Sequence, residues 1–143
     1  MTAVTPSLSD ATPTPTPTAP AGSSALSWFE IPVADLDRAE RFYTAVLQAP
    51  LRRQVMGPCT LAVLPYARPG TGGALFLGPA LQPSARGSLV YLSVGPDLDS
   101  ATARALAAGA QLLQPRVDLP EGMGSFVHLS DSEGNRIGLH ALR

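Results

Sequence analysis

The spacing of apolar residues in the first half of the chain predicts a strand, a helix and three further strands. Residues 26–33 form an apolar-rich run that is typical of a strand. Apolar side chains then recur at helical spacing from Leu36 to Leu47, directly after Asp35, a residue type favoured as a helix N-cap. Pro and Gly separate three short strand-like runs, at residues 52–56, 60–65 and 73–77.

The second half repeats this order. Residues 89–94 read as a strand, and an Ala-rich helix begins at Asp97 and ends before Gly109, a natural C-terminal cap. Strand-like runs follow at residues 111–115, 125–130 and 136–142. The sequence therefore predicts the α+β class: two βαβββ modules, about 25–80 and 88–143, that form a half-barrel around a cleft.

Composition narrows the functional classes. Only 15% of the residues are charged, the net charge is −1, and all ten basic residues are Arg, so we expect no nucleic-acid surface. No stretch of about 18 apolar residues occurs, so we expect no membrane span. The single Cys59 excludes an internal disulfide and favours a cytoplasmic location. Residues 1–24, rich in Thr, Pro, Ala and Ser, are expected to be a disordered tail before a domain at 25–143.

Strand alternation predicts which polar side chains share the cleft. If the odd-numbered residues of 29–33 face the helix, then Trp28 and Glu30 face the cleft. The same reasoning puts further side chains on that side, namely Tyr91, Phe126, His128 and His140. A turn at 131–135 that pairs residues whose numbers sum to about 266 sets His128 opposite Gly138.

Three interpretations of the polar residues Glu30, Tyr91, His128 and His140 remain open. Glu30 and His128 could act as base and acid, since a carboxylate and an imidazole exchange protons near neutral pH. The two His with Glu30 could instead hold a relocated metal ion. In the third interpretation these side chains only hydrogen-bond one another or line the rim of the cleft.

Two segments resemble a known superfamily. Trp28-Phe29-Glu30-Ile31-Pro32-Val33-Ala34-Asp35-Leu36-Asp37-Arg38-Ala39, with Phe42-Tyr43 and Val46-Leu47 after it, is similar to the opening of the vicinal oxygen chelate superfamily. Residues 131–140 are similar to its final hairpin, especially in a small bacterial glyoxalase-like branch. The superfamily includes glyoxalase I, bleomycin- and fosfomycin-resistance proteins and extradiol dioxygenases. The resemblance covers about residues 26–143 and implies a homodimer.

The resemblance also implies where a metal would bind. Family enzymes hold a divalent metal through His, Gln or Glu, one each from the first and last strands of both modules. At offsets of 61 and 62 residues between the modules, these positions are Trp28, Phe76, Leu89 and Gly138. None of the four offers a lone pair suited to a divalent metal, so we expect no metal cofactor.

We therefore expect a protein that binds a small organic ligand in an apolar cleft, through Trp28, Phe76, Tyr91, Phe126 and His140. The enzyme alternative is a glyoxalase-like lyase or isomerase that uses Glu30 and His128, either metal-free or with a relocated metal. Drug sequestration of the bleomycin type ranks last, because Glu30 is the only acid expected in the cleft.

Overall fold

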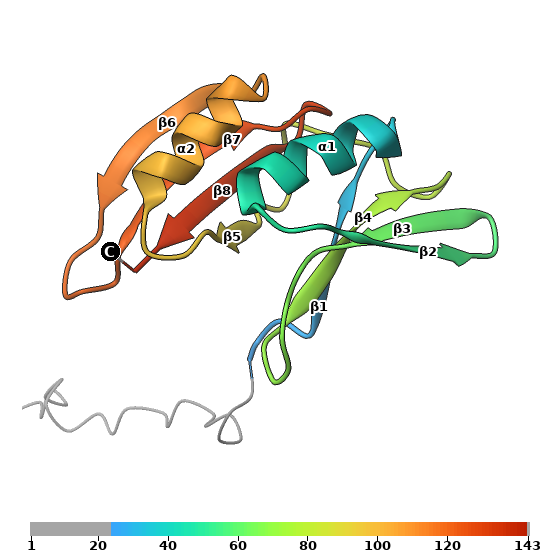
Figure 1. Ribbon diagram of the computed structural model, residues 1–143, viewed down its shortest axis with the longest axis horizontal. Helices are drawn as coiled ribbons and strands as arrows, with labels where there is room; N and C mark the ends of the chain where they lie inside the picture. The colour runs from blue at the N-terminus through green and yellow to red at the C-terminus, as the bar shows by residue number, and fades with distance from the viewer. Residues whose placement is uncertain (1–23, 143) are drawn as a thin grey trace, which may run out of the picture.

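The computed structural model describes residues 24–142 and shows two βαβββ modules (Figure 1). The first contains β1 (Trp28–Pro32), α1 (Leu36–Leu47), β2 (Arg52–Met56), β3 (Cys59–Val63) and β4 (Gly72–Leu77). The second contains β5 (Tyr91–Ser93), α2 (Leu98–Ala107), β6 (Gln111–Asp118), β7 (Ser125–Ser130) and β8 (Arg136–Ala141). The strand orders are β1-β4-β3-β2 and β5-β8-β7-β6, which confirms the predicted fold class. The expected tail lies outside the described residues, apart from Ser24.

Both helices begin at the predicted aspartates. The carboxylate of Asp35 accepts a hydrogen bond from the backbone N–H of Arg38, and that of Asp97 accepts one from Ser100. Each therefore satisfies one of the N–H groups that a helix start leaves without a partner. The apolar stripe of α1 packs into the core through Leu36, Ala39, Phe42, Tyr43 and Val46.

Three strands differ by three residues from the predicted length, and β1 is one of them, since it is shorter than the expected 26–33. β5 is shorter than the expected 89–94, although Gly138 N–H still donates to the Val90 carbonyl just before it. β6 runs on to Asp118 despite Pro115, because it is an edge strand whose pairing with β7 shifts register around Gln114 and Val117. An edge strand with a bulge tolerates the absence of the backbone N–H at Pro115.

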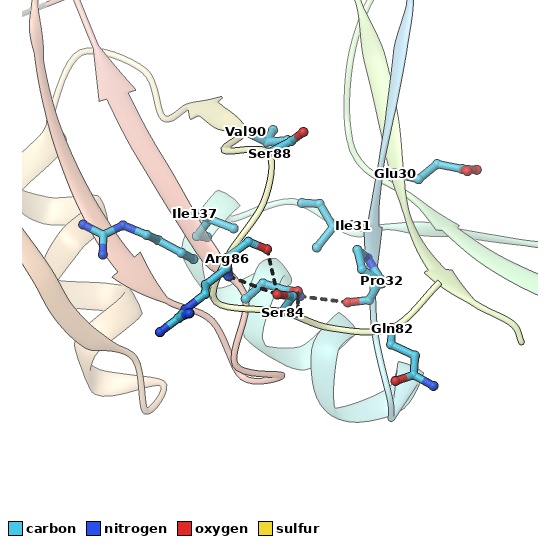
Figure 2. Close-up of a pocket in the computed structure, with 11 residues that line it drawn as sticks. Glu30, Ile31, Pro32, Gln82, Ser84, Arg86, Ser88, Val90 and Ile137 are labelled. Atoms are coloured by element: carbon cyan, nitrogen blue, oxygen red, sulfur yellow. Dashed lines mark hydrogen bonds between the residues drawn. The ribbon is translucent and has the colours of Figure 1, made fainter. Parts of the chain in front are cut away.

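A single core joins the two modules. It contains Ile31 and Leu75 from the first sheet, Leu139 and Val127 from the second, and residues of both helices. Each sheet thus turns one face toward this core. In Figure 2, Ile31 and Ile137 point into the space between the modules, whereas Glu30 points away from it. The opposite faces of the two sheets are therefore directed away from each other within one chain.

The turn between β7 and β8 fastens the second module to the first. The buried carboxylate of Glu133 accepts hydrogen bonds from the backbone N–H groups of Ala34 (2.9 Å) and Asp35 (2.8 Å), and it pairs with Arg38 (2.8 Å). The Tyr43 hydroxyl donates to the buried Asp131 across the same junction (2.6 Å). Asn135 Nδ2 donates to the Pro32 carbonyl (2.8 Å).

The charges at this junction shift two pKa values. Burial alone would raise the pKa of Glu133, but hydrogen bonds from Arg38, Asp35, Ser132 and Ala34 outweigh it and lower that pKa to about 2. Burial, with the nearby Asp131 carboxylate, raises the pKa of Tyr43 well above its usual value. Glu133 is therefore held as an anion at the start of α1, where the helix dipole also favours negative charge.

Candidate functional site

The first face, which we define as the side of the first sheet turned away from the core, is mainly apolar. Leu61, Val63 and Ala74 are buried there, with Phe76 packed against them. Trp28 is 37% exposed, and its ring meets that of Tyr66 edge-on, with centroids 6.1 Å apart. The Tyr66 ring lies over Gly72, so close that a Cβ at Gly72 would overlap the ring. The first face therefore offers aromatic surface, with Glu30 on β1 and the exposed Arg52 and Gln54 on β2 as its polar side chains.

The second face is the corresponding side of the second sheet and carries a chain of hydrogen bonds. Tyr91 Oη lies 2.6 Å from His128 Nε2, and Arg136 Nε and Nη2 lie 3.3 and 3.1 Å from His128 Nδ1. The Tyr91 ring also meets Phe126 edge-on, with centroids 5.5 Å apart. Burial and the Arg136 charge lower the pKa of His128, so its imidazole is neutral at pH 7.

His140 lies on the second face but outside this chain of hydrogen bonds. Its Nε2 lies 2.7 Å from the backbone carbonyl of Met123, in the loop between β6 and β7. The imidazole thus ties that loop to β8. Within residues 24–142, no three or more His, Cys, Asp or Glu side chains gather in a way that could hold a metal ion.

The strand registers revise the correspondence between the modules. Glu30 pairs with Ala74, and Tyr91, at an offset of 61 residues from Glu30, pairs with Gly138. The first-module counterpart of Gly138 is therefore Ala74, an offset of 64, and Phe76 corresponds to His140. The predicted equivalence of Gly138 with Phe76 was wrong. It applied the offset of 62 residues between the two helix starts to the last strands, where loops of different length make the offset 64.

The revised positions fit a metal no better. Trp28, Ala74, Leu89 and Gly138 have no side-chain oxygen or imidazole to offer, so the donor set does not match a divalent cation. The Tyr91 ring fills the space over Gly138, since a Cβ there would overlap it. A carboxylate at this position could not extend without displacing the ring.

The structure brings together only some of the predicted site residues. Trp28, Glu30 and Phe76 share the first face, while Tyr91, Phe126, His128 and His140 share the second. Because the two faces are directed away from each other, Glu30 and His128 do not meet within one chain. The pairing of His128 with Gly138 is as predicted.

Arg136 and Tyr66 are among the residues of these faces that were not predicted from the sequence. Arg136 lies two positions before Gly138, so the alternation that marked His140 could also have marked it. Tyr66 belongs to the connection between β3 and β4 and folds back over Gly72. No periodic pattern in the sequence predicts that Tyr66 packs over Gly72.

Two pockets between the modules lie beside the core and also include residues of both faces, Glu30 with Arg136 in one and Tyr66 with Tyr91 in the other. One, of about 200 Å³, lies under the segment that links the modules and is lined by Ile31, Ile137, Ser84 and Arg86, among others (Figure 2). Another, of about 370 Å³, is lined by Phe29, Leu47 and Leu92, with Tyr66 and Tyr91 also contributing. Neither is lined by Trp28, Phe76 or His128.

Comparison with known proteins gives the family. The model of the Glyoxalase/Bleomycin resistance protein/Dioxygenase superfamily matches residues 25–139, and the chain belongs to this superfamily. A search of curated protein sequences finds no match. No helix among the described residues is long and apolar enough to cross a membrane.

Solved structures share the fold at low sequence identity. Glyoxalase I from Zea mays is 22% identical with a TM-score of 0.61; the match covers 82% of this chain but only 46% of the maize chain. The fosfomycin resistance protein FosX from Listeria monocytogenes is 19% identical with a TM-score of 0.58, covering 83% and 93% of the two chains. A glyoxalase/bleomycin resistance protein/dioxygenase domain from Frankia sp. is 25% identical with a TM-score of 0.59, covering 85% and 93%.

Proposed function

We propose that this protein binds a small organic ligand in an apolar cleft, without the divalent metal that the family's usual ligand positions would hold. One observation carries the proposal. The family's metal-ligand positions have no metal-binding side chains; Trp28 occupies one of them, the Tyr91 ring covers another at Gly138, and both rings are exposed. Trp28 is 37% and Tyr91 46% exposed. Aromatic rings supply large contact areas to flat ligands.

We further propose that the cleft forms between two copies of the chain, as a homodimer in the cytoplasm. The first face of one copy would pack opposite the second face of the other, and the symmetric arrangement would create two such clefts. The proposal is supported by the directions of the two faces, because Trp28 and Phe76 on the first face and His128 on the second line neither of the two pockets between the modules of one chain. It is also supported by family membership, since superfamily members are often dimers.

The experiment is a fluorescence titration with 8-anilino-1-naphthalenesulfonate, an aromatic anion, in the presence of EDTA. We expect saturable binding by the wild-type protein, weakened by Trp28→Ala and by Tyr91→Ala. Val55→Ala is the matched control, because Val55 is 73% exposed and has the opposite strand phase from the first face. Absence of saturable binding, or binding that EDTA abolishes, would contradict the proposal.

The enzyme alternative also requires the dimer. Glu30 and His128 could act together only if two copies brought them into one cleft. Turnover of methylglyoxal with glutathione, lost in His128→Ala, would replace the binding function with a lyase or isomerase. We expect no such turnover.

A further inference from the structure

The second face holds a half-exposed phenol, Tyr91, whose hydroxyl makes one hydrogen bond within the chain. The Tyr91 ring is fixed by contacts with Gly138, Phe126 and His128, yet it is 46% exposed. Its hydroxyl has His128 as its hydrogen-bond partner and no second partner within residues 24–142. A phenol both donates and accepts, so one of these capacities remains available.

The direction of the hydrogen bonds at His128 shows whether the Tyr91 hydroxyl is left free to donate or to accept. A guanidinium can only donate, and Arg136 reaches His128 Nδ1 with both Nε and Nη2. Nδ1 must therefore be the unprotonated acceptor, and in the neutral imidazole the hydrogen is on Nε2. That N–H donates to Tyr91 Oη at 2.6 Å. The hydroxyl's own hydrogen then has no acceptor within residues 24–142.

The local charge selects the kind of atom that would accept this hydrogen. Arg136 takes part in no ion pair within the described part of the chain, so its positive charge is not neutralised. The lowered pKa of His128 is consistent with that charge nearby. An electron-rich oxygen is favoured at such a place, and a cation is disfavoured.

We propose that the Tyr91 hydroxyl donates a hydrogen bond to a carboxylate or carbonyl oxygen of an aromatic ligand, with His128 and Arg136 as positioning residues. The ring over Gly138 puts this donor where the family's last-strand metal ligand would lie. The hydroxyl thus takes over the recognition of ligand oxygen from a metal. This inference rests on the proposed function, because the aromatic part of the ligand needs the apolar cleft.

Three probes of one shape test the inference: 2-naphthoate, 2-acetylnaphthalene and 2-methylnaphthalene. We expect Tyr91→Phe to weaken 2-naphthoate binding about ten-fold and 2-acetylnaphthalene binding about three-fold, as for loss of a charged and of a neutral hydrogen bond. Binding of 2-methylnaphthalene should not change. The control is Val55→Ala, which has the opposite strand phase from the first face and should leave all three affinities unchanged.

The outcomes separate this inference from the proposed function. If none of the probes binds the wild-type protein, the apolar cleft itself is wrong. If all three bind and Tyr91→Phe changes none of the affinities, the cleft stands and the role of the hydroxyl is wrong. Circular dichroism and thermal melting check that Tyr91→Phe folds, which its retained ring should allow.

A spectroscopic measurement tests the positioning residues directly. The ¹⁵N chemical shifts of His128 should show a protonated Nε2 and a bare Nδ1 in the wild-type protein. Arg136→Met should allow both tautomers and weaken 2-naphthoate binding. A wild-type His128 protonated on Nδ1 would overturn the inference, because Tyr91 would then donate to His128 and have no hydrogen to offer.

Discussion

The two outer faces share a strand register but differ in chemistry. Each has an aromatic ring over a glycine of the last strand, Tyr66 over Gly72 on the first face and Tyr91 over Gly138 on the second. On the first face the ring meets Trp28, beside a buried apolar cluster. On the second it meets His128, which Arg136 holds in turn. The two modules thus share one backbone arrangement. The side chains of the first face offer apolar contact, and those of the second face offer hydrogen bonds.

The largest effect should come from the junction that fixes the directions of both faces. Glu133→Ala removes a buried carboxylate and leaves the N–H groups of Ala34 and Asp35 without their acceptor, so we expect a loss of about 3 kcal/mol in the free energy of unfolding. Glu40→Ala is the control, since Glu40 forms an exposed ion pair with Arg53 and should cost less than about 1 kcal/mol. Urea unfolding measures both; equal losses would contradict the role of Glu133.

The same carboxylate makes the junction sensitive to acid. The pKa of Glu133 is about 2 in the folded chain, below its ordinary value of 4.5, so the unfolded chain binds its proton more readily. The stabilisation is therefore complete above pH 4.5 and is lost as the pH falls toward 2, by up to about 3 kcal/mol. Urea unfolding of the wild-type protein and Glu133→Gln across this range measures the difference, which should shrink as the pH falls. A difference that stays constant would argue against this account.

A smaller loss of stability should show that the Tyr91 ring occupies the space over Gly138. Gly138→Ala adds a Cβ that overlaps the Tyr91 ring, so we expect a cost of about 1 to 2 kcal/mol. In a Tyr91→Ala background the ring is gone and most of that cost should disappear, a coupling that a double-mutant cycle measures. Equal costs of Gly138→Ala in both backgrounds would show that the ring does not occupy this space.

The smallest effect is the titration of His128. Burial and Arg136 keep its pKa below 6.5, so its stabilising neutral form is retained above that pH and is lost as the pH falls through the lowered pKa. A proton NMR titration should give a midpoint below 6.5, and Arg136→Met should raise it. A midpoint unaffected by Arg136→Met would break the link between these two residues.

The sequence predicted the composition of each face better than the relation between the faces. Alternation placed Phe126 and His128 on one side of β7, and turn arithmetic set His128 opposite Gly138, as the structure has them. Alternation is a property of one strand, however, and says nothing about how two sheets are oriented. That orientation depends on long-range bonds such as Tyr43 to Asp131 and Glu133 to Ala34, which link residues that no local pattern connects.

The most direct test of a cleft shared by two copies is to mix two defective variants. Trp28→Ala and Tyr91→Ala damage different walls, so a mixed dimer contains one cleft with both defects and one intact cleft. After unfolding and refolding together, we expect about a quarter of the wild-type 8-anilino-1-naphthalenesulfonate binding to return, because half of the randomly assorted dimers are mixed. If mixed dimers form, as native mass spectrometry can show, and no binding returns, the shared cleft is contradicted.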